Sequence, residues 1–391
     1  MKNWVIADNA AVGKLLCKIA SIVLDGGAEF HPSLRLMESD GSMWLSCDDS
    51  SPIAANEKED CSLVRMPSEL LLPLDGISWE ERSDRLVLIT SPDRLSPVQC
   101  ELLDLHIELY NATGKLPWFL LNHPDVLLQE SPSILSAVGR LRPGKKVAWT
   151  THAAAFLKTR MCKFRPTPKN VLEALEGEMS QESQGIVPII DLLNNKYDAP
   201  RFAFYDHGGI SVRVDPLRAS SECFAHYYKG RHDVLDLALG SGYLDQNTPF
   251  AHSAPVEVRV PGYGSLAVEG VTANKPTHLL DPPRVQFTDA GLSLSHLTCN
   301  IHKPQGLRVA LALALQGAFR GKGLQGSAAV EPIPIAGFLE ALVEANQALL
   351  ADLEQAAAPL TEQWPSADLL IRACRRQADL FEKGMAVVQS A

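Results

Sequence analysis

The first clear hydrophobic pattern lies between residues 9 and 25, where apolar side chains recur every three or four positions. This spacing places them on one face of an amphipathic helix. Asn9 or Asp8 can cap the start of that helix, and Gly26 with Gly27 can end it. Shorter apolar runs separated by turn residues follow over residues 33–72, which favours strands. The expected strands are 34–37, 43–46 and 62–66.

The spacing becomes helical over residues 80–160, with prolines in the connections. The expected helices are 101–110 and 153–162. Alternating patterns then return, and a hairpin is expected over 201–214, where Gly208 and Gly209 can form the tight turn. The other expected strands are 186–190 and 256–260.

Two helical stripes occupy about the last sixty residues. Phe338, Leu342 and Leu349 mark one face of the first helix, and Leu370 and Phe381 mark one face of the second. Because only a short connection separates them, we expect an antiparallel helix pair.

The order of these elements predicts an α+β protein in four parts. Residues 1–72 hold an N-terminal helix and the first half of a β domain, and residues 73–165 are a helical insertion. Residues 166–260 complete the β domain, and residues 261–391 form an all-helical C-terminal domain.

Composition narrows the class of protein. The 391 residues carry a formal charge of −10, with a pI of about 5.6, which argues against a broad nucleic-acid surface and against binding to an anionic membrane. The N-terminus lacks the long apolar stretch of a secretion signal, and the apolar run 307–319 is too short to span a bilayer. We therefore expect a cytoplasmic protein.

The eight cysteines form no CxxC pair and no Cys/His cluster with zinc-ligand spacing. We expect them to be mostly buried thiols, and we expect no metal site.

Four short motifs can be recognised between residues 156 and 247. Residues 185–195 read Gly-Ile-Val-Pro-Ile-Ile-Asp-Leu-Leu-Asn-Asn, and residues 221–231 read Ser-Glu-Cys-Phe-Ala-His-Tyr-Tyr-Lys-Gly-Arg. A short helical stretch ending in Gly-Tyr follows within 233–247, and Phe-Leu-Lys-Thr-Arg stands upstream at 156–160. Together they resemble the motifs of the SET family of methyltransferases, in the branch of the Rubisco large-subunit lysine methyltransferase.

The resemblance implies a fold of small curved β-sheets with a pseudoknot, a helical insertion and a helical C-terminal domain that binds a protein or peptide substrate. It also implies S-adenosylmethionine as methyl donor and a side-chain nitrogen, foremost that of lysine, as acceptor. The catalytic tyrosine is assigned to Tyr228, because the turn Lys229-Gly230 follows it; Tyr227 is the second choice, since neighbouring strand residues point to opposite faces.

The resemblance also assigns a cofactor site and a substrate channel. The cofactor-binding residues are Asn194, Asn195, Arg160, Gly41, Ser42 and Asp191, and the channel residues are Tyr243, Tyr227 and Ser241. The chain departs from the family at three of these places. Asn195 stands where the family has histidine, Met43 replaces the second glycine of the Gly-x-Gly that begins at Gly41, and Ser241 replaces an aromatic residue.

These residue types suit methyl transfer. An amide can hold the cofactor, and an arginine can bind its carboxylate. A dry aromatic channel keeps an acceptor lysine neutral, and a tyrosine hydroxyl orients its lone pair. The three departures leave two alternatives open: an enzyme with a small-molecule or non-lysine acceptor, and a catalytically silent binding module.

Overall fold

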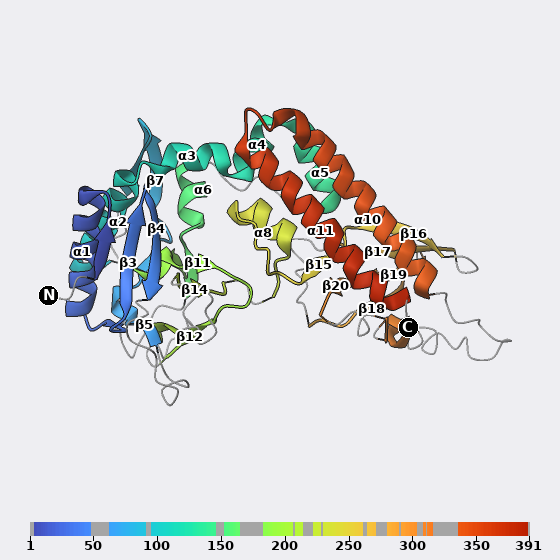
Figure 1. Cartoon of the computed structure of the whole chain (residues 1–391), viewed down its shortest axis with the longest axis horizontal. Helices are drawn as coiled ribbons and strands as arrows, with labels where there is room; N and C mark the ends of the chain where they lie inside the picture. The colour runs from blue at the N-terminus through green and yellow to red at the C-terminus, as the bar shows by residue number, and fades with distance from the viewer. Residues whose placement is uncertain are drawn as a thin grey trace. The chain divides into compact units, whose positions relative to one another are not determined.

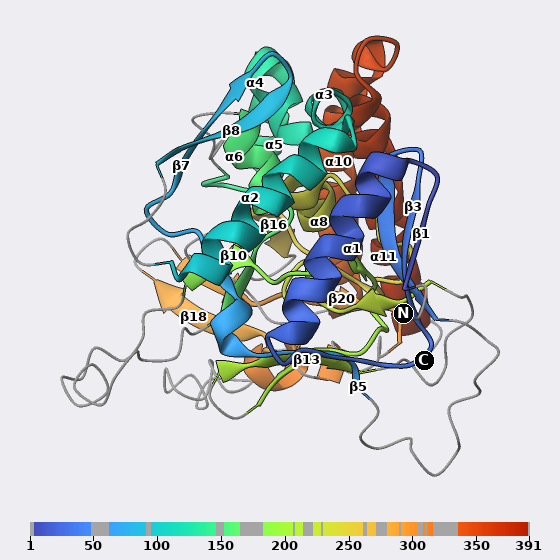
Figure 2. The ribbon, with the colours of Figure 1, turned by 90° about the vertical axis from the view of Figure 1, so that its left-hand side faces the viewer.

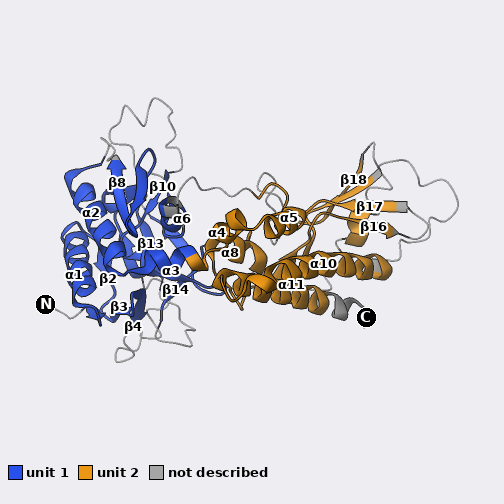
Figure 3. Ribbon diagram, turned by 90° about the horizontal axis from the view of Figure 1, so that it is seen from above, with its two compact units in different colours: residues 1–120, 149–227 blue, residues 121–148, 228–391 orange. Residues whose placement is uncertain are grey.

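The computed structural model divides the chain into two compact units (Figures 1 and 3). The first comprises residues 1–120 and 149–227, and the second comprises 121–148 and 228–391. The described residues are 4–47, 62–90, 95–145, 152–164, 183–205, 208–213, 222–227, 230–260, 264–270, 280–288, 291–302, 308–309, 311–315 and 335–389. Each unit has its own hydrophobic core, so each is described by itself. The predicted insertion, residues 73–165, is shared between the two.

The first unit joins short strands to a few helices. Its helical elements are α1 (Ala10–Asp25), α2 (Pro97–Ala112), most of α3 (Lys115–Asn122), α6 (His152–Lys158) and the single turns η2 (Ser68–Leu70) and η3 (Ile190–Leu192). Its strands are β1 (Val5–Ala7), β2 (Glu29–Phe30), β3 (Leu34–Ser39), β4 (Ser42–Cys47), β5 (Ser62–Met66), β6 (Leu72–Pro73), β7 (Ser78–Arg82), β8 (Arg85–Thr90), β9 (Cys162–Phe164), β10 (Ser183–Ile186), β11 (Asn194–Asn195), β12 (Phe202–Phe204), β13 (Ile210–Arg213) and β14 (Phe224–Ala225).

These strands form several small sheets rather than one large sheet. Their orders are β1-β3-β4, β6-β10-β9, β12-β13-β5-β2, β11-β14 and β7-β8. The β1–β3 and β11–β14 pairs are parallel, and the hairpin predicted over 201–214 is confirmed as β12 and β13. The strand predicted over 186–190 is wrong beyond Ile186, because the chain turns there into η3.

Helix α1 confirms the first pattern in the sequence. The side chain of Asn9 accepts hydrogen bonds from the backbone N–H of Ala11 (2.9 Å) and Val12 (3.4 Å), as an N-cap should. Its buried face packs on the core of the first unit, and α2 lies beside it (Figure 2). Each fully buried leucine or isoleucine on that face stabilises the fold by about 1.5–3 kcal/mol.

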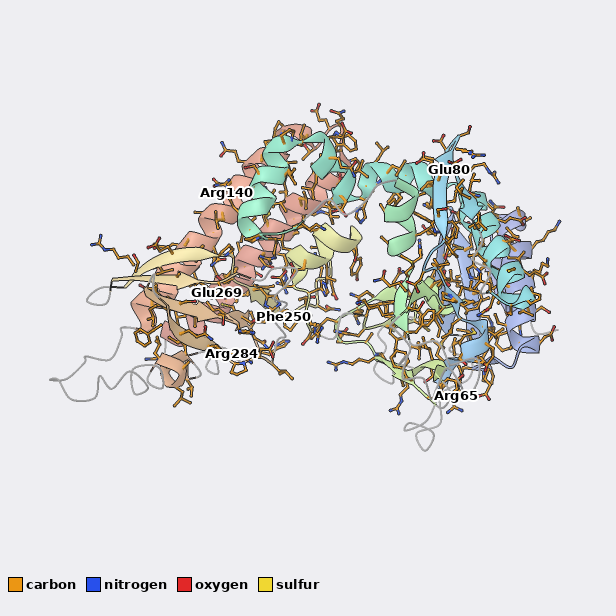
Figure 4. All side chains as sticks on the ribbon, turned by 180° about the vertical axis from the view of Figure 1, so that it is seen from behind. Arg65, Glu80, Arg140, Phe250, Glu269 and Arg284 are labelled. Atoms are coloured by element: carbon orange, nitrogen blue, oxygen red, sulfur yellow. The ribbon has the colours of Figure 1, made fainter. Side chains whose placement is uncertain are left out.

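The second unit combines helices with a separate sheet. Its helices are α4 (Pro124–Glu130), α5 (Pro132–Leu141), α8 (Val234–Ser241), α10 (Ile335–Ala357) and α11 (Pro365–Gln389), with the turn η6 (Ala358–Leu360) between the last two. Its strands are β15 (Phe250–His252), β16 (Val256–Val260), β17 (Gly264–Val268), β18 (Arg284–Thr288), β19 (Gly291–Ser295) and β20 (Thr298–Asn300). The predicted C-terminal helix pair is confirmed as α10 and α11, which pack along each other. Phe250, labelled in Figure 4, is fully buried in this unit.

The prediction that residues 261–391 are all helical is wrong. Residues 264–268, 284–288 and 291–295 join β16 in a four-stranded sheet of order β16-β17-β19-β18. Leu266, Val268 and Leu294 are buried in the core of the second unit, to which α10 also contributes. Each strand has five residues, too few for its alternation to stand out in the sequence, and the central β17–β19 pair is a non-local parallel contact.

Within the described part of the chain, no helix is both long enough and apolar enough to cross a membrane.

Candidate functional site

The first unit brings the two central motifs together at a pair of short parallel strands. Asn194 and Asn195 of β11 lie opposite Phe224 and Ala225 of β14. The Asn195 side-chain oxygen accepts the backbone N–H of Tyr227 (3.0 Å), across 32 residues of sequence. The Asn194 amide donates to the Glu222 carboxylate (2.7 Å). The two asparagines therefore fix the second motif against the first by side-chain hydrogen bonds.

Tyr227 lies half-buried at the end of this strand pair. Its hydroxyl donates to the carbonyl oxygen of Leu193 (2.8 Å), with that of Ile190 at 3.3 Å. Its ring meets Phe202 edge-on, with 4.8 Å between centroids. A hydroxyl whose proton is held by backbone carbonyls still has oxygen lone pairs that can accept a hydrogen bond. Tyr228, the sequence-based choice for the catalytic tyrosine, lies outside the described residues.

Asp191 is buried in the turn η3, just before β11. Its Oδ2 accepts the hydroxyl of Tyr110 (2.7 Å), which comes from α2. Nε2 of His106, one helical turn earlier on α2, lies 4.0 Å from its Oδ1. Burial, together with the negative charge of Asp191, raises the pKa of the Tyr110 phenol well above its usual value. The Tyr110 phenol therefore stays protonated at physiological pH and donates a hydrogen bond to this carboxylate.

Arg160 follows α6 and lies among aromatic rings. Its guanidinium carbon is 5.7 Å from the ring centre of Phe156 and 6.0 Å from that of Tyr110. Its Nε is buried and has no hydrogen-bond partner within the described residues, and the same holds for Oδ1 of Asp191. Arg160, Asp191 and Tyr227 all act electrostatically on Tyr110, so these four side chains form one group, here called the Tyr110 cluster.

Cys162 of β9 borders the same cluster. Burial, with a smaller contribution from the Asp191 carboxylate, raises the pKa of its thiol to about 12. The thiol is therefore protonated at neutral pH and is a poor nucleophile.

Gly41 and Ser42 lie at the hairpin between β3 and β4. Gly41 has φ +69°, its N–H donates to Glu38 (2.8 Å), and a Cβ built on it would lie 2.4 Å from the carbonyl oxygen of Thr113. Glycine is thus required here by the turn and by the end of α2. Strand β4, which starts at Ser42, contacts η3 and reaches the second motif at Leu45, whose carbonyl accepts the N–H of Cys223 (2.8 Å).

Ser241 and Tyr243, the predicted channel residues, belong to the second unit. Ser241 ends α8, and Gly242 caps that helix in the left-handed conformation, with its N–H on the carbonyl of Ala238 (3.1 Å). The short helix expected before the Gly-Tyr pair is therefore present.

Tyr110 and His106 are not among the candidate residues predicted from the sequence. Both lie in the helix predicted over 101–110, and both interrupt its apolar face with a polar group. A buried tyrosine usually finds a hydrogen-bond partner for its hydroxyl, and that rule was the one available signal. Among the described residues, no group of three or more His, Cys, Asp or Glu side chains could hold a metal ion.

No model of a known protein family matches the sequence, and no curated protein matches it at a significant level. The function is therefore inferred from the geometry of the first unit.

Proposed function

We propose that this chain is an S-adenosylmethionine-dependent N-methyltransferase of the SET type, acting on a protein or peptide side chain, with lysine as the first acceptor to test. The observation that carries the proposal is the hydrogen bond from the Tyr227 N–H to the Asn195 side chain across the parallel β11–β14 pair. It joins the two motifs of the resemblance at one place. The pseudoknot of that family is part of the proposal, and the parallel pairing of these two strands supports it.

The Tyr110 cluster suits the amino-acid end of the cofactor. That end carries a carboxylate and an ammonium group, and the cluster holds a buried arginine donor at Arg160 and a buried carboxylate oxygen at Asp191, each without a hydrogen-bond partner within the described residues. An unpaired buried donor and an unpaired buried acceptor are both costly unless a ligand pairs with them. Arg160 would hold the carboxylate, and Asp191 with the amides of Asn194 and Asn195 would hold the rest of that end.

When bound, the cofactor supplies an electrophilic methyl group on a sulfonium. The protein then has to deliver a neutral amine in line with that methyl group and close to it. The Tyr227 hydroxyl directs its proton to the Leu193 carbonyl, and a phenol oxygen that donates in this way can also accept an amine N–H and orient the amine. We therefore assign the orienting role to Tyr227, with Tyr228 as the rival assignment. The helix pair α10–α11 remains the proposed substrate-binding region.

Isothermal titration of the whole protein with S-adenosylmethionine, and with its demethylated product, tests the cofactor half of the proposal. We expect micromolar binding to the wild type and at least a tenfold loss in Arg160→Gln and Asn195→Ala. Tyr205→Phe, a half-exposed tyrosine of the same unit, is the matched control and should bind as the wild type does. Absence of binding to the wild type at millimolar cofactor would refute the proposal and favour a silent binding module.

Transfer of a labelled methyl group to lysine-containing peptides and to free amines tests the acceptor half. Tyr227→Phe should bind cofactor but transfer at least a hundredfold more slowly, since a misplacement of a reacting group by about 1 Å can cost about 10²-fold in rate. Loss of transfer in Tyr228→Phe alone would reverse the assignment of the two tyrosines. Transfer to free amines but not to peptides would favour the small-molecule alternative.

A further inference from the structure

The chain makes a strained turn immediately before η3. Ile189 has φ +68° and ψ −44°, and the N–H of Ile190 donates to the carbonyl of Pro188 (2.8 Å). These features define a γ-turn of the rare kind with positive φ. A β-branched residue almost never adopts such a φ, because its side chain collides with its own backbone. Surrounding contacts must therefore hold Ile189 in this conformation.

Two contacts hold the turn. The Ile189 side chain is buried in the core of the first unit, and the Tyr110 hydroxyl donates to the Asp191 carboxylate (2.7 Å). Tyr110 is 1% exposed, and its ring is fixed edge-on against Phe156 at 5.5 Å. The donor thus comes from α2, and Tyr110 lies 81 residues from Asp191 in sequence.

The same turn also contacts the candidate catalytic tyrosine. The carbonyl groups of Ile190 and Leu193, at the two ends of η3, lie 3.3 and 2.8 Å from the Tyr227 hydroxyl. A relaxation of Ile189 toward ordinary φ would rotate the peptide groups that follow it. The direction in which the Tyr227 hydroxyl points its proton, and hence its lone pairs, depends on this turn.

We propose that Tyr110 is a positioning residue for Tyr227: by holding Asp191, it keeps the strained turn in the conformation that receives the Tyr227 hydroxyl. The chain of contacts is Tyr110 to Asp191, Asp191 to the turn, and the turn to Tyr227. The consequence for methyl transfer rests on the proposed function, whereas the coupling between the two tyrosines is a property of the protein alone.

Tyr110→Phe tests the coupling, because it removes one oxygen and leaves the ring that packs on Phe156. The readout is the NMR spectrum of the protein labelled with ¹³C at the phenol carbon of its seven tyrosines, with the Tyr227 signal assigned by its loss in Tyr227→Phe. We expect the Tyr227 signal to shift in Tyr110→Phe while the Tyr205 signal stays in place. An unchanged Tyr227 signal would overturn the proposal.

Asp191→Asn is the conservative variant, since its amide oxygen can still accept the Tyr110 hydroxyl. It should leave the Tyr227 signal much nearer its wild-type position than Tyr110→Phe does. If Asp191→Asn does not fold, the Tyr110→Phe spectrum alone tests the coupling, because Tyr110→Phe keeps the packing of the aromatic ring.

The enzymatic arm separates positioning from binding. Tyr110→Phe should keep the acceptor KM, while kcat at saturating S-adenosylmethionine falls at least tenfold. An unchanged kcat at saturating cofactor would overturn the positioning role, whatever the change in cofactor affinity, because Asp191 is also a proposed cofactor ligand. If the wild type binds no cofactor, the proposed function fails, and the NMR result still decides whether Tyr110 positions Tyr227.

Discussion

Replacing Arg142 by methionine should strongly lower the free energy of unfolding of the second unit, because the Arg142 side chain pairs with two carboxylates inside this unit. Arg142, just after α5, donates from Nη2 to Asp233 (2.7 Å) and from Nε to Asp236 (2.6 Å). The Arg142 and Asp233 side chains are 6% and 0% exposed. Burial by itself would raise the pKa of Asp233, but the Arg142 charge and the N–H groups of Asp236 and His252 hold it well below its usual range.

The structure sets the expected magnitude. Removing one partner of a buried ion pair costs about 3–5 kcal/mol, because the other charge stays buried without compensation. Asp233 keeps the N–H groups of His252 (2.8 Å) and Asp236 (2.9 Å), so we expect the lower end, about 3 kcal/mol. Asp233→Asn should cost a similar amount. The double variant should lose less than the sum of the two, by about 1.5 kcal/mol or more.

Arg140→Met is the matched control, two residues earlier on α5. Arg140, labelled in Figure 4, pairs with Asp352 at 2.7 Å, but the two side chains are 52% and 46% exposed. Solvent screens such a pair, so its loss should cost no more than about 0.5 kcal/mol.

Urea unfolding followed by circular dichroism measures both variants, and hydrogen exchange of α5 and α11 assigns the loss to the second unit. A loss below about 1 kcal/mol for Arg142→Met, or one equal to that of Arg140→Met, would refute the reasoning.

Three further predictions concern stability. Gly41→Ala should destabilise the first unit by about 2 kcal/mol or more in thermal unfolding, since φ is +69° and the new Cβ would lie 2.4 Å from the Thr113 oxygen. Gly76→Ala is the control: its φ is +80° but no atom lies within 4 Å of the new Cβ, so it measures the cost of the backbone conformation without a steric clash. Leu342→Ala should cost about 2–5 kcal/mol in urea unfolding, because this α10 side chain is fully buried, and a smaller loss would show that the core collapses around the gap. Burial, only partly offset by the Asp233 charge, lowers the pKa of His252 in the folded protein. The unfolded chain therefore takes up the proton first, and the free energy of unfolding should fall as the pH drops below about 6.5. His252→Gln should make the free energy of unfolding less dependent on pH in this range, and an unchanged pH dependence would contradict the role of His252.

Part of the candidate site could be predicted from the sequence. The motifs placed Asn194, Asn195 and Asp191 before a tyrosine pair, and the structure brings Asn195 to Tyr227. Tyr110 could not be found in this way, because its partner Asp191 lies 81 residues away and nothing local distinguishes this tyrosine from a core residue. The sequence-based preference for Tyr228 over Tyr227 depended on the turn Lys229-Gly230. That turn carries no information about the carbonyl groups of Ile190 and Leu193, which lie at the Tyr227 hydroxyl.

Local patterns in the sequence by themselves determined the long helices and one hairpin. Helices α1, α2, α10 and α11 carry several turns of periodic apolar residues, and glycines mark the turn between β12 and β13. Such signals depend on residues that are close in sequence, so they can be recognised without knowledge of the fold.

Only the tertiary structure decided how these elements are grouped. Helices α4 and α5 belong to the second unit because their apolar faces pack with α8, α10 and α11, although the sequence placed them in one insertion with α2. The five-residue strands of the second sheet, and the two-residue strands β11 and β14, are stable only through their partners. The physical reason is that a short strand or a buried polar group gains its free energy from contacts that are distant in sequence, and those contacts exist only once the chain has folded.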